Sequence, residues 1–331
     1  IIMNMLQGAP WLLAHKSMLG INQPRKISLL GQEYVLWKDR NHQVMALPNA
    51  CPHMGAMLSE GWCREKKDRS SVVVCPFHAL EFDEEGCTVL PGSNKKTLPQ
   101  MKPLDLIIHN DFIWSYGDTK PQIPIPPVLS EIEAKYKLVG SIADVSVKTS
   151  LLSMLLNMHD YNHQNGTHSQ LFSIKEVKFK SFGDYGHHSH AFYDLFKSPY
   201  SLIEKLKNPG LFLLPGVIPV HLENCFPSFV IFHGENPLGK IAQINFFIPE
   251  SENYTRTYVL LYAIPKSPLF KLLEKQFLKF AKTITEQDAD ILSKLYQDME
   301  QKIKLNNEIG MDWVKRNYAN WPEVGQPCLT K

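Results

Sequence analysis

Two short stretches, Cys51-Pro-His53 and Cys75-Pro-Phe-His78, decide what the first third of the chain can be. Each combines a thiol with an imidazole in a proline-containing segment, and each follows a run of strand-forming residues. Two thiolates on one iron and two imidazoles on the other can hold a [2Fe-2S] cluster. A structural zinc site is the alternative, although zinc fingers normally begin with Cys-x₂₋₄-Cys and end with His-x₃₋₅-His. The predicted cluster ligands are Cys51, His53, Cys75 and His78.

Short strand-forming runs separated by turn residues make up most of the first part of the chain. Asn110-Asp111, between the last two runs, favours a hairpin turn. The proline-rich segment Pro121–Pro127 disfavours both helix and central strand, so it predicts a stiff connector between domains 1–120 and 121–331. The predicted strands are Lys26–Leu30, Tyr34–Lys38, Val44–Leu47, Ser71–Val74, Leu104–His109 and Phe112–Tyr116.

The second part of the chain mixes helical and strand patterns. A helix is predicted over Leu151–His163, and a long amphipathic helix over Ser267–Asp298, where Ser267-Pro268 supplies the start signal. The sequence after Leu305 has no regular pattern and is predicted to be irregular. The predicted strands are Val139–Val147, Lys175–Phe182, Phe229–His233, Ile241–Ile248 and Thr255–Ile264.

The composition is that of an ordinary globular protein and excludes several classes of function. The 331 residues are 44% apolar and 21% charged, and the net charge of +2 gives no electrostatic basis for binding nucleic acid. No apolar run approaches the roughly 18 residues of a transmembrane helix, and we expect no signal peptide. Six cysteines are too few for a disulfide scaffold, so we expect free or metal-bound thiols in a reducing, cytoplasmic compartment.

A second group of metal-binding residue types begins at Asn157. Asn157, Asp160 and His163 follow one another at spacing three, which places them on adjoining faces of the predicted helix. A glycine downstream would let the helix unwind, so that His168 could fold back towards His163. The alternatives are a polar helix end with solvated histidines, or a zinc-type pair of His159 and His163 at spacing four.

Both groups resemble the motifs of one family. Cys51–Leu58 reads Cys-Pro-His-x-Gly-Ala-x-Leu and is followed by Cys-Pro-Phe-His, which closely resembles the Rieske iron–sulfur motif. Many members carry Gly-Trp after the last histidine, whereas this chain has Ala79-Leu80. The spacing Asp160-x₂-His163-x₄-His168, with an asparagine three residues earlier, resembles the catalytic iron motif of Rieske non-haem iron oxygenases. The chain is therefore similar to the terminal oxygenase (alpha) subunits of that family.

The resemblance implies a third iron ligand, an aspartate on the last long helix, for which Asp288 and Asp290 are the candidates. Asp288 falls in the apolar stripe of this helix, and Asp290 lies roughly opposite. A carboxylate in a buried stripe is costly unless it is paired or bound to metal, so Asp288 is the predicted ligand. With His163 and His168 it would complete a facial triad for mononuclear Fe(II). The stripe consists of Phe277, Ala281, Ile284, Ile291, Leu292 and Leu295.

The resemblance also implies a fold and an activity. The expected fold is α+β: an N-terminal antiparallel β Rieske domain, then a helix-grip (START-like) catalytic domain whose antiparallel sheet wraps the long C-terminal helix. The expected protein is a terminal oxygenase that takes electrons from NAD(P)H through a separate ferredoxin or flavin reductase. It would use O₂ to hydroxylate or oxidatively demethylate an apolar or aromatic small molecule, with monooxygenation preferred. A Rieske electron-transfer protein with a non-catalytic ligand-binding domain is the alternative.

Asp160 and Asn157 receive roles beside the iron from the same resemblance. In the family, the counterpart of Asp160 bridges a Rieske histidine of one subunit and an iron histidine of its neighbour. This implies that Asp160 contacts His163 and, across a subunit boundary, His78. The two sites of one chain would be too far apart for this contact, so the resemblance implies a homotrimer.

The remaining chemistry-bearing residues have simpler interpretations. The histidines of His187–His190 are interpreted as a solvated loop, and Cys63 and Cys87 as free thiols. Aromatic residues in the second part of the chain are numerous enough to line an apolar substrate pocket. They are Phe172, Phe192, Phe212, Phe226, Phe229, Phe232, Phe246 and Tyr258.

Overall fold

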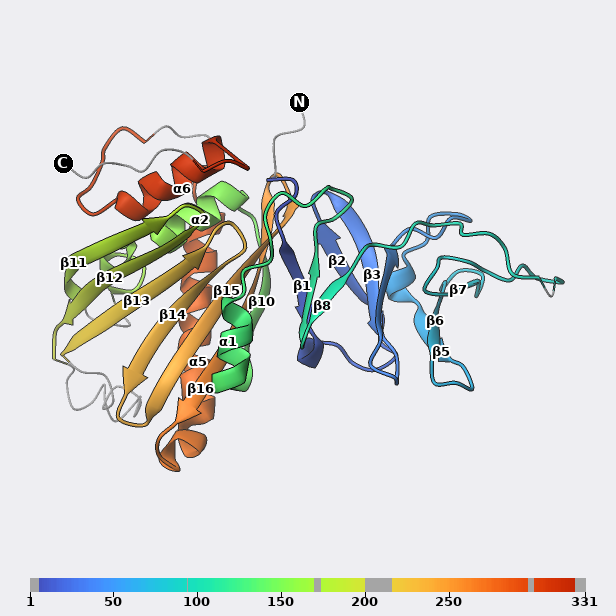
Figure 1. The fold of residues 1–331 in the computed structure, drawn as a ribbon, viewed down its shortest axis with the longest axis horizontal. Helices are drawn as coiled ribbons and strands as arrows, with labels where there is room; N and C mark the ends of the chain where they lie inside the picture. Colours follow the sequence, from blue (N-terminus) through green and yellow to red (C-terminus); the bar gives the residue numbers. More distant parts are fainter. Residues whose placement is uncertain (1–5, 94, 170–173, 200–215, 297–300, 325–331) are drawn as a thin grey trace. The chain divides into compact units, whose positions relative to one another are not determined.

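The computed structural model describes residues 6–93, 95–169, 174–199, 216–296 and 301–324 (Figure 1). The chain divides into two compact units, one of residues 1–123 with 248–252 and the other of residues 124–247 with 253–331. The first unit is built from three-stranded sheets, and the second from one seven-stranded sheet with helices. The expected α+β class and the order of a β domain followed by a sheet with a long helix are confirmed.

Three antiparallel three-stranded sheets form the first unit. Every predicted strand overlaps an observed one, and the predicted hairpin turn places Asn110 in the left-handed region (φ 53°) between β8 and β9. Strands β1, β5 and β7 were not predicted. The strands are β1 (Trp11–His15), β2 (Arg25–Leu29), β3 (Gln32–Lys38), β4 (Val44–Pro48), β5 (Trp62–Glu65), β6 (Ser71–Val74), β7 (Glu81–Phe82), β8 (Ile107–His109) and β9 (Phe112–Ser115). Short 3₁₀ helices cover Lys16–Met18 (η1) and Leu58–Glu60 (η2).

The second unit is organised around one sheet in the order β10-β16-β15-β14-β13-β12-β11. Its strands are β10 (Lys137–Val147), β11 (Ile174–Tyr185), β12 (His188–Lys197), β13 (Val217–Cys225), β14 (Phe229–Asn236), β15 (Gly239–Ser251) and β16 (Tyr254–Pro265). Its helices are α1 (Val128–Lys135), α2 (Leu151–His159), η3 (His163–Asn165), α5 (Leu269–Ser293) and α6 (Ile309–Ala319).

Helix α5 runs across one face of this sheet, behind the strands in Figure 1. Its apolar residues pack on β10 and β16, where Ala281 joins Ile142 and Val259 in a buried cluster. The buried positions of the helix after Ala281 are Thr285, Asp288 and Leu292, spaced by four, three and four. Two of these are polar, which marks the stretch of the helix that serves more than packing.

The sequence prediction differs from the structure at the ends of α2 and α5 and in the stretch that forms α6. Helix α2 ends at His159 rather than His163, because Asp160 leaves the helical conformation (φ −87°, ψ 96°). Helix α5 ends at Ser293, and residues 297–298 of the predicted helix lie outside the described residues. Residues 309–319, predicted to be irregular, form α6, because Trp313 and Val314 are buried by tertiary packing that a local pattern does not reveal.

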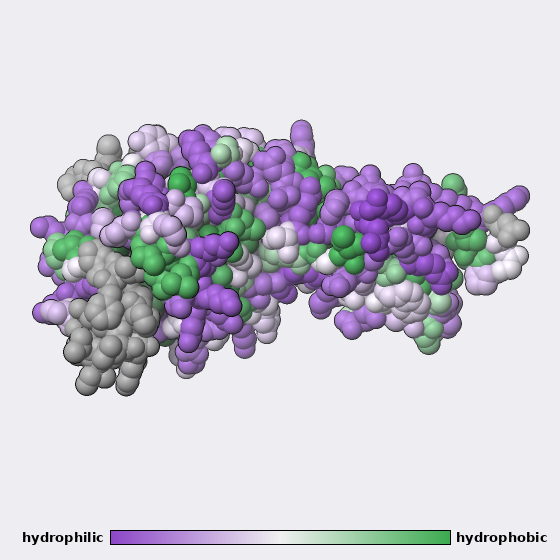
Figure 2. Space-filling view, turned by 90° about the horizontal axis from the view of Figure 1, so that it is seen from below, coloured by the Kyte–Doolittle hydropathy of each residue, from purple (hydrophilic) through white to green (hydrophobic). Residues whose placement is uncertain are grey.

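The surface agrees with the near-neutral composition. Figure 2 shows hydrophilic side chains over most of the face that it draws, with smaller hydrophobic patches between them. Among the described helices, none is long and apolar enough to cross a bilayer.

Replacing Gly310, at the start of α6, with alanine should destabilise the second unit. A Cβ atom there would lie 2.4 Å from the Tyr161 hydroxyl and 2.9 Å from the His159 carbonyl oxygen, and Tyr161 is itself buried. Overpacking of this kind lowers the free energy of unfolding by about 1–3 kcal/mol. Chemical denaturation of Gly310→Ala measures the loss. Gly216→Ala, where a Cβ meets nothing within 4 Å, is the control and should leave stability nearly unchanged.

Candidate metal centres

The loop after β4 and the loop after β6 have the same backbone conformation. The Cys51 amide donates to the Ala56 carbonyl (2.9 Å), and the Gly55 amide donates to the Cys51 carbonyl (2.8 Å). In the second loop, the Cys75 amide donates to the carbonyl five residues on (2.9 Å), and the Ala79 amide donates to the Cys75 carbonyl (3.1 Å). The two motifs therefore fold as equivalent loops.

Equivalent positions in the two loops take left-handed backbone angles, Gly55 at φ 76° and Ala79 at φ 54°. Alanine in this region costs about 1 kcal/mol relative to glycine, so the second loop carries strain that the first does not. Many Rieske proteins carry glycine where this chain has Ala79. The alanine is thus accommodated in the backbone without a change of loop shape.

The tips of these loops bring the four predicted cluster ligands together in pairs. The Cys51 and Cys75 thiols are buried and hydrogen-bonded to each other, and burial is the main cause that raises the pKa of Cys51. The imidazoles of His53 and His78 are exposed, with their Nδ1 atoms 3.2 Å apart. Two Nδ1 atoms this close cannot both carry a proton, so at least one presents a lone pair. Paired thiols beside paired imidazoles are the donor set that a Rieske-type [2Fe-2S] cluster requires.

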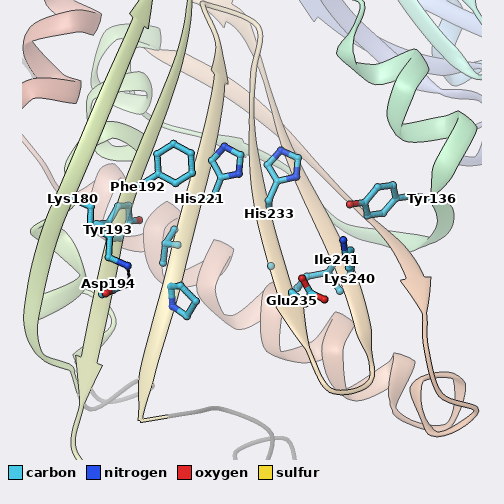
Figure 3. Close-up of a pocket in the computed structure, with 13 residues that line it drawn as sticks. Tyr136, Lys180, Phe192, Tyr193, Asp194, His221, His233, Glu235, Lys240 and Ile241 are labelled. Atoms are coloured by element: carbon cyan, nitrogen blue, oxygen red, sulfur yellow. Dashed lines mark ion pairs between the residues drawn. The ribbon is translucent and has the colours of Figure 1, made fainter.

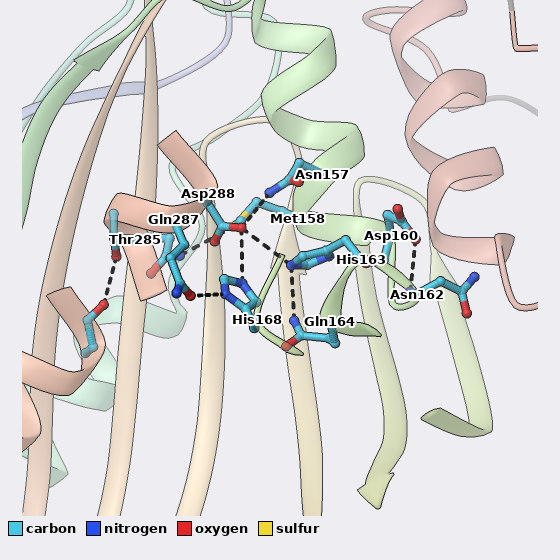
Figure 4. Close-up of polar contacts among 12 residues, drawn as sticks. Asn157, Met158, Asp160, Asn162, His163, Gln164, His168, Thr285, Gln287 and Asp288 are labelled. Atoms are coloured by element: carbon cyan, nitrogen blue, oxygen red, sulfur yellow. Dashed lines mark hydrogen bonds and ion pairs between the residues drawn. The ribbon is translucent and has the colours of Figure 1, made fainter. Parts of the chain in front are cut away.

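The second predicted group also converges, around a carboxylate on α5 (Figure 4). Asp288 Oδ1 lies 3.2 Å from His168 Nε2 and 3.5 Å from His163 Nε2. The possible ligand atoms of the three residues all lie within 4.8 Å of one another. His168 is fully buried, and the side chains of the other two are 11% exposed. Two imidazoles and one carboxylate at this spacing fit a mononuclear non-haem iron.

Both imidazoles are oriented by contacts at the nitrogen remote from Asp288. His168 Nδ1–H donates to the Gln287 side-chain oxygen (2.8 Å), and His163 Nδ1–H donates to the backbone carbonyl of Asp160. With the proton held on Nδ1, the Nε2 lone pair of a neutral imidazole is left for a metal. Burial lowers the pKa of His168, but the Asp288 carboxylate more than compensates, and the net pKa is raised.

Asn157 and Asp160, predicted to act beside the iron, occupy different positions. Asn157, on α2, donates its side-chain amide to Asp288 Oδ1 at 3.3 Å. Asp160 is the residue at which α2 ends, and its carboxylate accepts the Asn162 backbone amide at 2.9 Å. Its contact with His163 is made by the backbone carbonyl, whereas the prediction named the aspartate without distinguishing side chain from backbone.

The two alternatives for this segment do not match the geometry. His159 is buried with its ring 5.4 Å from that of Trp313, and its Nδ1–H donates to the Leu155 carbonyl, so it forms no pair with His163. Burial lowers the pKa of His159 to about 4. His163 and His168 do not lie on a solvated helix end, since both are turned towards α5.

The apolar stripe that distinguished Asp288 from Asp290 is narrower than predicted. Ile291 and Leu295 are exposed rather than buried. Asp290 is exposed as well and forms an ion pair with Lys294 at 2.7 Å. Asp288, the predicted ligand, is nevertheless a buried carboxylate beside both histidines.

A narrow cavity adjoins Asp288 between α2, α5 and the sheet. Its volume is about 10 Å³, room for about one water molecule. None of the described aromatic residues that were predicted to line a pocket lines this cavity, and Phe172 and Phe212 lie outside the described residues. The lining is Val147, Met154, Met158, Asn245, Phe247, Thr257, Thr285, Asp288, Ala289 and Leu292.

Several residues of this site were missed by sequence reasoning. Gln287 directly precedes the predicted ligand and orients His168, and its position could have suggested this. The Gln164 side chain lies 3.1 Å from His163 Nε2, where its amide donates to the lone pair that a metal would take. Asn245 reaches the site from β15, and no local signal indicates its contact with Met158 across 87 residues.

Comparison with known proteins assigns the first of these two sites to a family. Residues 10–103 match the Rieske [2Fe-2S] domain family. Aminopyrrolnitrin oxygenase PrnD of Pseudomonas fluorescens is 24% identical over 51% of this chain and 48% of its own length. The oxygenase subunit of vanillate O-demethylase from a Pseudomonas species is 24% identical over 47% of this chain and 43% of its own length. The chain thus spans about half the length of these curated relatives.

Solved structures share the fold over nearly the whole chain. Dicamba monooxygenase bound to 3,6-dichlorosalicylic acid superposes with a TM-score of 0.72 at 15% identity, covering 95% of this chain and 96% of that chain. NdmB of Pseudomonas putida CBB5 superposes with a TM-score of 0.66 at 15% identity, covering 95% and 92%.

The fold and its two groups of ligands define a protein with a Rieske domain joined to a helix-grip domain. Residues 10–103 form a Rieske [2Fe-2S] domain, and the chain is similar to the terminal oxygenases named above in sequence over about half its length and in fold over nearly all of it. The donor sets of its two sites fit a [2Fe-2S] cluster and a mononuclear iron.

Proposed function

We propose that this protein is the terminal oxygenase of a Rieske system. It would use O₂ and electrons from an NAD(P)H-dependent reductase or ferredoxin to hydroxylate or oxidatively demethylate an apolar or aromatic small molecule. The observation that carries this proposal is the convergence of His163, His168 and Asp288 within 4.8 Å, in a chain that also has a Rieske domain. An electron carrier would have no use for this second set of ligands.

The residues of the two sites divide into those that would bind metal and those that orient the metal ligands. Cys51, His53, Cys75 and His78 would bind the [2Fe-2S] cluster, and His163, His168 and Asp288 the Fe(II). When bound, the two metals supply electron transfer and activation of O₂.

The surrounding residues prepare the iron ligands. Asn157 donates to Oδ1 of Asp288 and so holds the carboxylate between the two imidazoles. Gln287 and the Asp160 carbonyl keep the imidazole protons on Nδ1. Gln164 donates to His163 Nε2 and has to release that lone pair when a metal takes it.

The substrate class is supported by the lining of the cavity beside Asp288. Methionine, phenylalanine, valine and leucine side chains supply most of its wall, and Asn245 and Thr257 are polar groups that could orient a substrate. Methionine side chains are flexible, so Met154 and Met158 can yield to a ligand larger than the present cavity. The proteins named above include one demethylase and one monooxygenase, which supports monooxygenation over dioxygenation.

The exposed position of the cluster ligands supports the proposal of a homotrimer. His53 and His78 are exposed, and so are the apolar side chains of Met54 (65%) and Phe77 (58%) beside them. Exposed apolar side chains around a redox site indicate a surface that is covered in the assembly. We propose that a neighbouring chain covers this surface and places its Asp160 carboxylate against His78. We further propose that the protein works in the cytoplasm and does not bind nucleic acid.

Oxygen consumption tests the proposed function directly. The chain is reconstituted anaerobically with iron and sulfide, reduced through a surrogate ferredoxin and reductase, and exposed to ¹⁸O₂ with a panel of methylated and unmethylated aromatic compounds. We expect substrate-dependent O₂ uptake and a product that carries ¹⁸O or has lost a methyl group. A protein that binds only the two cluster irons and cycles electrons without an oxidised product would instead be the electron carrier.

Replacing Asp160 with asparagine should slow electron transfer between the metals by about 10- to 100-fold while both remain bound. Asparagine keeps the oxygen that accepts the Asn162 amide, so the loop should fold and only the charge is lost. Stopped-flow reduction of the iron site in a single turnover measures the effect. Asp312→Asn, a half-buried aspartate paired with Lys304, is the control. Unchanged kinetics in Asp160→Asn would count against the bridging role.

A further inference from the structure

Four histidines and a glutamate gather on three neighbouring strands of the second unit, away from its iron site. His188 and His190 are two residues apart on β12, and His221 and Glu223 are two apart on β13. His190 is directly opposite Glu223 in the sheet, and His221 is directly opposite His233 of β14. Since side chains two apart on a strand share a face, all five point to the same side of the sheet. Sequence reasoning interpreted His188 and His190 as part of a solvated loop, which the structure shows to be wrong.

This side of the sheet is the one opposite the iron site. Tyr193, next to the histidines on β12, points the other way and stacks on Tyr161, beside the iron-site loop. Ala191 and Leu222, also on the alternate positions, are fully buried. Figure 3 shows the rings of His221 and His233 side by side on the face turned away from the α5 helix.

Glu223 is the centre of this histidine cluster (His188, His190, His221, His233 and Glu223). His188 Nε2–H donates to its Oε1 at 3.0 Å, and His233 Nε2–H donates to its Oε2 at 2.8 Å. The Glu223 side chain is only 11% exposed, whereas that of His188 is 40% exposed. A carboxylate this buried is costly unless positive charge or hydrogen bonds satisfy it. Neutral imidazoles satisfy it partly, and a cation would do so fully.

The remaining contacts resemble those that orient metal ligands. The possible ligand atoms of His188, His190 and Glu223 lie within 4.8 Å of one another. His190 Nδ1 is 2.9 Å from His221 Nε2, which fixes its ring. His233 holds the second carboxylate oxygen, and thereby fixes the direction of the first. Contacts of this kind set the orientation of histidine and carboxylate ligands in metal sites.

We propose that His188, His190 and Glu223 form a third metal site, which binds zinc. Two imidazoles and one carboxylate match the ligand types of three-ligand zinc sites, in which water takes the fourth tetrahedral position. His188 would bind through Nε2 by keeping its proton on Nδ1, and the ion would replace the hydrogen bond that this nitrogen now makes with Glu223. A cavity of about 320 Å³, lined in part by Phe192, His221 and His233, adjoins the site and gives the ion a route from solution.

The consequence for the protein is a link between two strands. The ligands come from β12 and β13, so a bound ion would tie these two strands together on the face of the sheet opposite α5. Because the folded chain would bind zinc and the unfolded chain would not hold this geometry, zinc should raise the midpoint of thermal unfolding, and the rise should grow with the logarithm of the zinc concentration above Kd.

Zinc content is the direct test. The iron-loaded enzyme is dialysed against micromolar zinc, and zinc and iron per chain are counted by elemental analysis. We expect one zinc per chain in addition to the iron, with a rise in unfolding temperature that a chelator reverses. His188→Ala, His190→Ala and Glu223→Gln should each weaken zinc binding at least about tenfold and abolish the rise. His187→Ala is the matched control, because that ring lies against Phe226 and Trp321 and should leave zinc binding unchanged.

A variant of the iron site separates this proposal from the proposed function. Asp288→Ala should lose iron but keep the additional zinc, since its site shares no residue with the histidine cluster. Retention of stoichiometric zinc by the His188→Ala/His190→Ala double variant would overturn the assignment. So would an enzyme that takes up no zinc at these concentrations while its iron content and far-ultraviolet circular dichroism show it to be folded.

Discussion

Replacing Asp288 with alanine should remove the mononuclear iron and reduce oxygenation at least about 1,000-fold, since metal activation is worth several kcal/mol of barrier. Asp288 Oδ1 is the one atom to which both His163 Nε2 and His168 Nε2 are directed. Without it, two imidazoles remain, which do not make the facial set that iron needs. Iron per chain should fall from three to the two of the cluster, with the visible spectrum of the cluster unchanged.

The fold should tolerate this substitution in the absence of iron. Asp288 is a buried carboxylate, and its removal relieves desolvation as well as losing the contact with Asn157. Asp290→Ala is the matched control two residues along the same helix. It removes an exposed pair with Lys294, which is worth at most about 0.5 kcal/mol, and should keep all the iron. Full turnover by Asp288→Ala would refute the ligand assignment.

Replacing Cys75 with serine should bleach the cluster and stop electron delivery. A serine hydroxyl is not deprotonated at neutral pH and is a poorer ligand for iron than a thiolate, so the site at the Cys51 loop would be left incomplete. We expect loss of both cluster irons, loss of visible absorbance, and no measurable turnover with a reductase as electron source. Iron bound at Asp288 should remain, which iron analysis detects.

Cys63 provides the control for this experiment. It packs against the same core as Cys51 and Cys75, and burial raises its pKa to about 12. As a protonated thiol outside the two loops it should not bind iron. Cys63→Ser should therefore keep its colour, at a modest loss of stability. A coloured, reducible Cys75→Ser protein, or a colourless Cys63→Ser protein, would show that the loops had been assigned the wrong thiols.

Most of the strands in the first unit were predictable from the sequence. Turn chemistry and alternating apolar residues indicated six strands, because these signals are local. The short β5 and β7 escaped prediction. Trp62–Glu65 and Glu81–Phe82 are too short to show a pattern, and their pairing with β6 defines them.

The iron site was predictable only as a set of residue types. The spacing of Asp160, His163 and His168 indicated the chemistry, and the position of Asp288 on an amphipathic helix indicated a buried carboxylate. The sequence did not show that α2 stops at His159. It also did not show that Gln287 orients His168, because that contact joins residues 119 positions apart. The stripe used to choose Asp288 even included Ile291 and Leu295, which are exposed.

By itself, the sequence determined which donor atoms this protein has and on which kinds of element they lie. Thiols, imidazoles and carboxylates at characteristic spacings are local information, and local spacing is what a chain carries before it folds. The tertiary structure decided which of those donors face one another. His188 and His190 looked like a solvated turn along the chain, yet register across three strands brings them to Glu223 and His221. Strand pairing joins residues that are distant in sequence, so only the folded sheet could reveal that cluster.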